Sequence, residues 1–251
     1  MVAILVVLAG LAISGTVNAG ELPDLIESIR PSVVGIGTQQ KLRRPPNSLT
    51  GTGFVVGDGN FVITNAHVVA NELDTDRRER RVVFVGRGRK PSIREASVVR
   101  IDDFHDLALL RFDGPPVAAL KLGRSATVRE GQSIIFTGFP IGAVLGLYPV
   151  THQGIVSAIS PSAIPQHSIK DATAQQLRRL RKPFDVLQLD ATAYPGNSGS
   201  PVMDRATGLV IGIINSVLVK DSKENVLKDP SAISYAIPVE HAIALLAAPA
   251  Q

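Results

Sequence analysis

Residues 53–64 read GFVVGDGNFVIT, in which two apolar runs, Gly53–Val56 and Phe61–Thr64, flank the turn sequence GDGN. Runs rich in valine, isoleucine and phenylalanine favour β-strands. A short segment of glycine, aspartate and asparagine between two such runs predicts a tight turn that returns the chain beside itself. The stretch therefore predicts an antiparallel β-hairpin, and short apolar runs separated by turns recur along the chain.

Strand patterns lie on both sides of a connecting segment near Gly114–Glu130. About six runs precede it and about six follow it, so we expect an all-β fold of two packed six-stranded antiparallel β-barrels. The first barrel would cover about residues 30–120 and the second about residues 130–238, in one domain of residues 20–251 with a short C-terminal helix. The other expected strands are Val33–Gly37, Val82–Val85, Ser97–Ile101, Leu107–Phe112, Gln132–Phe139, Gly154–Ile159, Val186–Leu189, Ser200–Met203, Leu209–Val217 and Ala232–Ile237. Helices are expected at Glu21–Ile29, His67–Asn71, near Ala172–Leu180 and at Glu240–Ala247.

The composition excludes several classes of protein. The chain has 251 residues, of which 45% are hydrophobic and 19% are charged, as is typical of a folded globular protein. It contains no cysteine, which excludes disulfide bonds, a cysteine nucleophile, thiolate zinc sites and iron–sulfur clusters. Tryptophan is absent and aromatic residues make up 4%, which argues against base-stacking surfaces for single-stranded nucleic acid.

Positive charge is concentrated in two segments of a chain whose formal net charge is +4. Nine basic and two acidic residues lie in Arg77–Arg100, and the stretch 175–182 ends in RRLRK. Such segments suit an anionic partner, but no nucleic-acid-binding motif accompanies them. We therefore interpret them as solvated surface and expect no nucleic-acid partner.

The N-terminus has the pattern of an export signal. Residues Met1–Ile13 carry no charged side chain, and the run is shorter than the roughly 20 apolar residues that a spanning helix needs. Val17-Asn18-Ala19 has the small-x-Ala form of a signal-peptidase site. We expect residues 1–19 to be a signal peptide cleaved near Ala19, with an uncleaved membrane anchor as the alternative. An exported chain without cysteine fits a bacterial periplasmic or secreted protein with no stable membrane span after processing.

Three short motifs carry residues suited to acyl-transfer chemistry. His67 lies in ITNAHVV, where a buried strand would end in a fixed imidazole that can serve as a general base. Asp106 lies in HDLALL, directly before an apolar run, so its carboxylate would be held at the rim of the core facing an imidazole. Ser198 lies in AYPGNSGSP, where the flanking glycines permit a sharp turn that presents a hydroxyl and converging backbone N–H groups.

Each motif taken alone has a purely structural explanation: a core histidine, an aspartate that caps a turn, and a common glycine–serine loop. Asp102 and Asp103 compete with Asp106, but they lie outside the apolar run. The set is more specific, because the order histidine, aspartate, serine, with separations of 39 and 92 residues, is that of the chymotrypsin class among triad hydrolases. The connecting segment would place the histidine and the aspartate in the first barrel and the serine in the second.

Eight blocks between about Leu25 and Pro238 match one family pattern in order. They are Gly51–Val56, Thr64–Val69, Asp106–Leu110, Gly138–Gly142, Gly154–Ala158, Gln188–Ala191, Gly196–Ser198 and Tyr235–Pro238. On these blocks the chain resembles the trypsin-like serine endopeptidases of the Deg/HtrA group, which have the chymotrypsin-like double barrel. The resemblance implies that His67 is the general base, Asp106 its orienting partner and Ser198 the nucleophile. It also implies an oxyanion hole formed by Gly196, Asn197 and Ser198.

The chain departs from that group in three places. The group usually carries one or two PDZ modules after the protease, and none is expected here, which argues against PDZ-driven activation and cage assembly. Ser200 stands where the group usually has a second glycine. Residues 161–184 form a longer loop than usual, which we interpret as an exposed surface insertion.

The resemblance also predicts which substrate side chains are preferred before the scissile bond. The pocket for the residue before the scissile bond would be lined by Thr192, Ile213, Ile214 and Asn215, which are neutral, so small or medium apolar side chains are expected there. Cleavage of a polypeptide by this chemistry needs neither a metal nor an organic cofactor, and the five histidines show no metal-ligand spacing. The rival interpretation is a catalytically silent binding or chaperone protein of the cell envelope. The sequence leaves homo-oligomer formation open.

Overall fold

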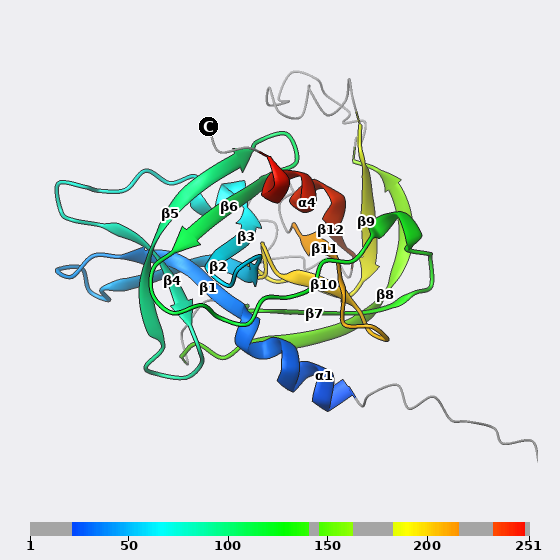
Figure 1. The fold of residues 1–251 in the computed structure, drawn as a ribbon, viewed down its shortest axis with the longest axis horizontal. Coiled ribbons are helices and arrows are strands. Elements are labelled where there is room, and N and C mark those ends of the chain that lie inside the picture. Colours follow the sequence, from blue (N-terminus) through cyan, green and yellow to red (C-terminus); the bar gives the residue numbers. More distant parts are fainter. Residues whose placement is uncertain (1–21, 141–145, 163–182, 216–232, 249–251) are drawn as a thin grey trace, which may run out of the picture.

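The structure is a computed structural model that describes residues 22–140, 146–162, 183–215 and 233–248 (Figure 1). Among these residues no helix is both long enough and apolar enough to cross a membrane. Three expected features lie outside the described residues: the signal peptide at 1–19, the helix near 172–180 and the basic stretch at 175–182.

The first barrel closes in the strand order β1-β2-β3-β6-β5-β4, and every neighbouring pair is antiparallel. β2 and β3 form the expected hairpin, in which Phe54 lies opposite Ile63. A short 3-10 helix, η2 (Ala66–Val69), follows β3 directly. The strands are β1 (Val33–Gln39), β2 (Asn47–Val56), β3 (Phe61–Asn65), β4 (Arg80–Val85), β5 (Ser92–Asp102) and β6 (Leu107–Phe112).

The second barrel closes in the order β10-β11-β12-β9-β8-β7, again with antiparallel neighbours. Its strands are β7 (Ser133–Gly138), β8 (Val150–Pro161), β9 (Asp185–Asp190), β10 (Pro201–Asp204), β11 (Val210–Ile214) and β12 (Ile233–Pro238). The shorter elements outside the barrels are α1 (Leu22–Ile29), η1 (Arg30–Ser32), η3 (Ser125–Thr127) and α4 (Val239–Ala247).

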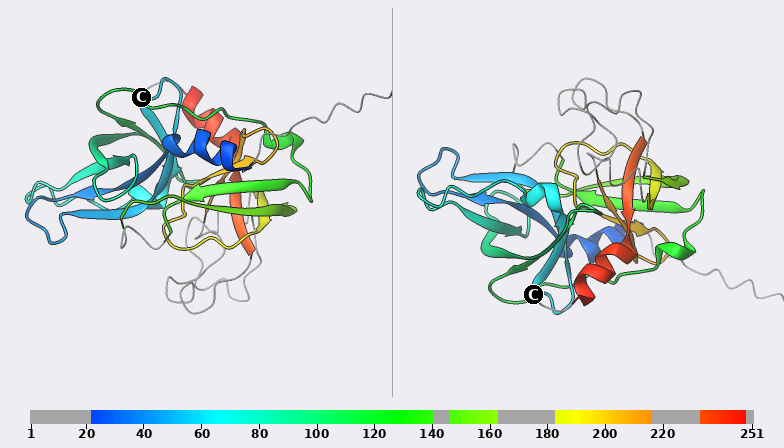
Figure 2. Two further views of the ribbon diagram at one scale, coloured as in Figure 1. Left: turned by 90° about the horizontal axis from the view of Figure 1, so that it is seen from below. Right: turned by 90° about the horizontal axis from the view of Figure 1, so that it is seen from above.

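The barrels lie side by side, and α4 lies across their junction (Figures 1 and 2). α4 contacts β5 and β6 of the first barrel and β11 and β12 of the second. Arg100 of β5 extends the contact, because its Nη1 donates a hydrogen bond to the Leu245 carbonyl of α4 over 3.1 Å. The junction of the barrels is therefore closed on one side by a helix that follows directly from the last strand.

β6 shows how one strand serves two cores. Successive strand residues point to opposite faces, so an uninterrupted apolar run suits a strand that is buried on both sides. Leu107 and Leu109 join a cluster that the two barrels share, whereas Ala108 and Leu110 point into the first barrel. The second barrel contributes to the shared cluster Ile135, Met203, Val210, Ile213 and Ile237, and α4 adds Val239, Ala242 and Leu245.

The prediction of two six-stranded antiparallel barrels with a short C-terminal helix is confirmed. The largest differences lie at strand ends, where backbone pairing continues past the apolar run. β2 begins at Asn47 rather than Gly53, because Asn47 and its successors pair with β1. β5 begins at Ser92 rather than Ser97, and its residues alternate between more and less exposed positions. The strand expected at Leu209–Val217 is described only as far as Ile214.

Candidate active site

His67 and Asp106 form a direct pair at the edge of the first barrel. His67 lies in η2, and its backbone N–H donates to Asp106 Oδ1 over 2.9 Å. Its ring Nδ1 lies 2.6 Å from Asp106 Oδ2. With the proton on Nδ1 directed at this carboxylate, Nε2 is left as a hydrogen-bond acceptor, which is the tautomer that a general base needs. The two contacts therefore fix both the position and the tautomer of the imidazole.

Asp106 is held by its backbone as well as by its side chain. It has a φ of 55°, a left-handed conformation that aspartate adopts more readily than most residues. Its carbonyl oxygen accepts hydrogen bonds from the Ala66 N–H and from Asn65 Nδ2, each over 3.0 Å. Because the buried strand β6 begins at the next residue, the conformation is anchored to the core.

The second barrel reaches Asp106 through Asn215. This residue directly follows β11 and is only 2% exposed. Its Nδ2 donates to Asp106 Oδ2 over 2.7 Å, so the oxygen that faces the imidazole also accepts from the other barrel. Sequence reasoning placed Asn215 in the substrate pocket and missed this contact, since nothing in the sequence relates residues 109 positions apart.

Ser198 lies on the tight turn between β9 and β10. Gly196 and Gly199, on either side of it, have φ values of 98° and 87°, which glycine adopts at little cost because it has no Cβ. The Gly199 N–H donates to the Ile214 carbonyl at the end of β11 over 3.0 Å. The serine therefore sits on a turn whose shape the two glycines permit and which β11 supports.

The Ser198 turn lies against the segment that carries His67. The Thr52 N–H of β2 donates to the Ser198 carbonyl over 2.9 Å. At Gly51, a Cβ would come within 2.8 Å of both Cγ atoms of Val68 and within 3.1 Å of the Ser198 carbonyl oxygen. Gly51 therefore packs between the neighbour of His67 and the backbone of Ser198. With the contact across the barrels described above, this brings the three predicted triad residues to one junction.

The Thr52 side chain joins the turn to both barrels, a role that the sequence did not reveal. Its Oγ1 donates to the Gly196 carbonyl over 2.7 Å and accepts from the Phe139 N–H over 3.0 Å. Its own carbonyl accepts from Thr64 Oγ1 over 2.6 Å. A single buried hydroxyl of the first barrel thus holds two backbone groups of the second, one of them in the loop of the nucleophile.

Two polar side chains of the loop that carries Ser198 have no hydrogen-bond partner among the described residues. Asn197 and Ser200 are both fully buried. Among the residues that the structure describes, neither side-chain atom of Asn197 nor the Ser200 hydroxyl has a hydrogen-bond partner. Gly138 lies against both, since a Cβ added there would meet Ser200 Oγ and Asn197 Oδ1. The Ser200 hydroxyl is therefore fully buried and unsatisfied within the described part of the chain.

Replacing Ser200 by alanine is expected to stabilise the protein. A buried hydroxyl without a partner loses its hydration and gains nothing, so its removal should raise the free energy of unfolding by about 1 kcal/mol. For a domain of this size the Tm should rise by about 2–4 °C, as measured by calorimetry. Ser133→Ala, at an exposed serine of β7, is the control and should leave the Tm unchanged. A lower Tm for Ser200→Ala would mean that the hydroxyl has a partner after all.

The four residues predicted to line the substrate pocket differ from one another in exposure. Thr192 is partly exposed. Ile213 and Ile214 are 0% exposed and pack in the shared cluster and in the core of the second barrel, so in this structure neither side chain is available to a bound peptide. The Asn215 amide is occupied by Asp106. The pocket stays a prediction. Of the four residues predicted to line it, only Thr192 is exposed enough to contact a bound peptide.

The described residues contain no group of three or more histidine, aspartate or glutamate side chains placed to hold a metal ion. The geometry that they do contain is that of an acid–base pair beside a serine loop, supported by both barrels. Such an arrangement can move a proton from a hydroxyl to an imidazole and can stabilise the imidazolium that results.

Known proteins share this sequence pattern. The family model of the trypsin-like peptidase domain matches residues 51–213. Serine protease HTRA1A of Danio rerio is 32% identical over 221 residues, covering 86% of this chain and 39% of that protein. A probable periplasmic serine endoprotease, DegP-like, of Pseudomonas fluorescens is 30% identical over 279 residues, covering 95% of this chain and 51% of that protein. The chain thus spans about two fifths to one half of the length of these relatives.

Similar solved structures point to the same group of proteases as the sequence relatives. The HtrA-type protease AlgW with a tripeptide superposes with a TM-score of 0.63 at 26% identity, covering 90% of this chain and 62% of that one. The family model covers more than half of the chain, and the fold, the order of the motifs and the relatives all point in one direction. The chain belongs to the trypsin-like peptidase family, and its relatives are serine proteases of the HtrA group.

Proposed function

We propose that the protein is a serine endopeptidase in which His67, Asp106 and Ser198 act as the triad. The observation that carries the proposal is the double contact of His67 with Asp106 at the junction where the Ser198 turn is held. Family membership supports the same reaction class. Both barrels contribute to the site, so it exists only when they are packed together.

The reaction follows from the roles of these groups. Ser198 Oγ attacks the carbonyl carbon of a peptide bond while His67 Nε2 accepts its proton, and Asp106 stabilises the imidazolium. The negative charge that develops on the carbonyl oxygen is stabilised by the backbone N–H groups of Gly196 and Ser198, with Asn197 shaping the loop between them. His67 then protonates the leaving amine, and water hydrolyses the acyl-enzyme to regenerate the hydroxyl.

The substrate that we propose is the unfolded or misfolded chain of an exported protein. HtrA-type proteases with bound peptides are among the similar solved structures, which supports a polypeptide ligand. The Pseudomonas relative is named as periplasmic, which supports a location in the bacterial envelope after removal of residues 1–19. We propose that Thr192 contributes to the pocket for the residue before the scissile bond, with preference for small or medium apolar side chains.

A fluorophosphonate probe tests the proposed activity, because it reacts only with an activated serine. The probe should modify the purified protein, and mass spectrometry of its peptides should place the adduct on Ser198. Unfolded casein should be cleaved by the same preparation. Ser198→Ala should abolish both signals, whereas Ser133→Ala, at an exposed serine, should keep both. Binding of casein without cleavage, together with no adduct on the wild-type protein, would identify a silent binding protein instead.

A further inference from the structure

A second aspartate–histidine pair lies just before Asp106 in the chain. The turn between β5 and β6, residues 103–106, is here called the Asp106 turn. The His105 N–H donates to Asp102 Oδ1 over 3.0 Å, and His105 Nδ1 lies 2.6 Å from Asp102 Oδ2. These are the same two contacts that join His67 to Asp106. The Asp106 turn is thus fixed at its start by one such pair and forms another at its end.

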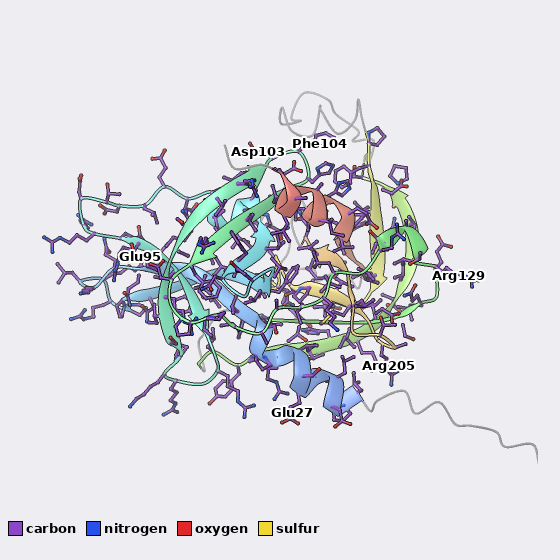
Figure 3. All side chains as sticks on the ribbon, viewed as in Figure 1. Glu27, Glu95, Asp103, Phe104, Arg129 and Arg205 are labelled. Atoms are coloured by element: carbon purple, nitrogen blue, oxygen red, sulfur yellow. The ribbon has the colours of Figure 1, made fainter. Side chains whose placement is uncertain are left out.

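Rings from the second half of the chain pack on this pair. The imidazole of His241, in α4, stacks on that of His105 with 3.7 Å between ring centroids and 19° between planes. Phe184, directly before β9, meets both imidazoles edge-on, at 4.8 Å from His105 and 5.3 Å from His241. Asp103 and Phe104, labelled in Figure 3, lie on the same turn beside α4. Asp102, His105 and His241 are here called the histidine cluster.

The surroundings of His241 favour the neutral form of its ring. Burial lowers the pKa of His241, and the charge of His105 lowers it further, to about 4 from an ordinary 6.5, although Asp102 and Glu240 act in the opposite direction. Burial raises the pKa of Asp102, but its hydrogen bonds from His105 outweigh this and leave it below the ordinary value. The His241 ring therefore faces charged or titratable groups from two elements: Asp102 and His105 of the first barrel, and Glu240 of α4 itself.

We propose that the histidine cluster positions the Asp106 turn for catalysis, and that a positive charge on His241 displaces that turn and with it the Asp106 carboxylate. The inference rests on the proposed role of Asp106. His105 and His241 are positioning residues, because they act through the backbone of the Asp106 turn and not on the substrate. The contact also links α4 to catalysis, in addition to the packing of α4 in the shared cluster.

The direction of the pH effect follows from the protons bound in each state. When α4 is released from the turn, His241 regains its ordinary pKa of 6.5 and binds a proton that the packed state binds only near pH 4. The packed arrangement is therefore fully favoured above about pH 6.5 and loses its advantage as the pH falls toward 4. The Tm of the wild type should fall more steeply over this window than that of His241→Phe, which keeps an aromatic ring but cannot be charged.

His241→Lys introduces the positive charge at pH 8, so the effect of the charge is measured without lowering the pH. With casein as substrate, kcat should fall about tenfold or more while KM stays within about twofold, since displacement of a catalytic group affects the chemical step. His241→Phe should keep kcat within about twofold of the wild type. The matched control is Ile243→Lys, which adds the same charge to an α4 side chain that is 37% exposed, and it should behave as wild type.

The assays are run well below the Tm of each variant, so that a loss of stability alone leaves kcat unchanged. The proposal is overturned if His241→Lys is folded and has the kcat of the wild type. If His241→Lys fails to fold, kcat and KM are measured for His241→Ala, which removes the stack without adding charge. A normal kcat overturns the proposal, and a lowered kcat supports it. If the wild type is itself inactive and unlabelled by fluorophosphonate, the proposed function fails, which is a different outcome.

Discussion

Asp106→Asn is expected to lower kcat by about 10³- to 10⁴-fold while leaving the protein folded. The asparagine amide is nearly isosteric with the carboxylate, and asparagine tolerates the φ of 55° that this position requires. One of its two polar atoms must then be an N–H donor. The Asn215 amide already donates at Oδ2 and the His67 backbone N–H donates at Oδ1, so either orientation of the new amide sets donor against donor.

The chemical consequence falls on the imidazole. If the new amide directs its NH₂ at His67 Nδ1, the ring must accept there and carry its proton on Nε2, which is the wrong tautomer for accepting the proton of Ser198. The rate of fluorophosphonate labelling should fall with kcat, while KM changes little. The Tm should fall because two donors are opposed, but the protein stays folded. Asp103→Asn is the matched control, because this exposed carboxylate lies on the same turn, and it should keep wild-type rates. Wild-type rates for Asp106→Asn would exclude the proposed triad.

The position of Asp106 in the chain explains why it could be identified from the sequence. Its carboxylate precedes four buried apolar residues, and a polar group tied to such a run has little freedom to lie elsewhere than at the rim of the core. His67 is equally constrained, because it lies in η2, which directly follows the buried strand β3. The two-barrel fold follows from the same signal, since runs such as Leu107–Leu110 mark strands that are buried on both sides.

Contacts between distant positions could not be predicted in this way. Asn215 donates to Asp106 across 109 positions, and Thr52 to the Gly196 carbonyl across 144. Neither residue has a local pattern that distinguishes it from any other polar residue beside a strand. Ile213 and Ile214 show a second limit. As apolar neighbours on a strand they point to opposite sides, and the sequence did not reveal that both sides are core here.

Thr52→Val should have the second large effect, a loss of roughly 2 to 5 kcal/mol in the free energy of unfolding. Valine has almost the shape of threonine, so the packing of this fully buried side chain is kept. Without the hydroxyl, the Gly196 carbonyl loses its donor and the Phe139 N–H loses its acceptor. Leaving the buried Phe139 N–H and the partly buried Gly196 carbonyl unpaired costs more than the two hydrogen bonds contributed when formed.

Activity should fall as well, because the Gly196 carbonyl belongs to the turn that presents Ser198. Without the Thr52 bond the Gly196–Asn197 peptide keeps the hydrogen bond from the Asn197 N–H to the Tyr194 carbonyl but loses the one at its own carbonyl oxygen. The backbone N–H groups proposed as the oxyanion hole are then held less firmly. Denaturant unfolding and the rate of fluorophosphonate labelling measure the two effects on the same samples. Thr52→Ser keeps the hydroxyl and removes only a methyl group, so it should retain the labelling rate and lose much less stability. If valine and serine at this position behave alike, the hydroxyl does not hold the loop, and the Ser198 turn is supported by its backbone hydrogen bonds to Thr52 and to Ile214 of β11.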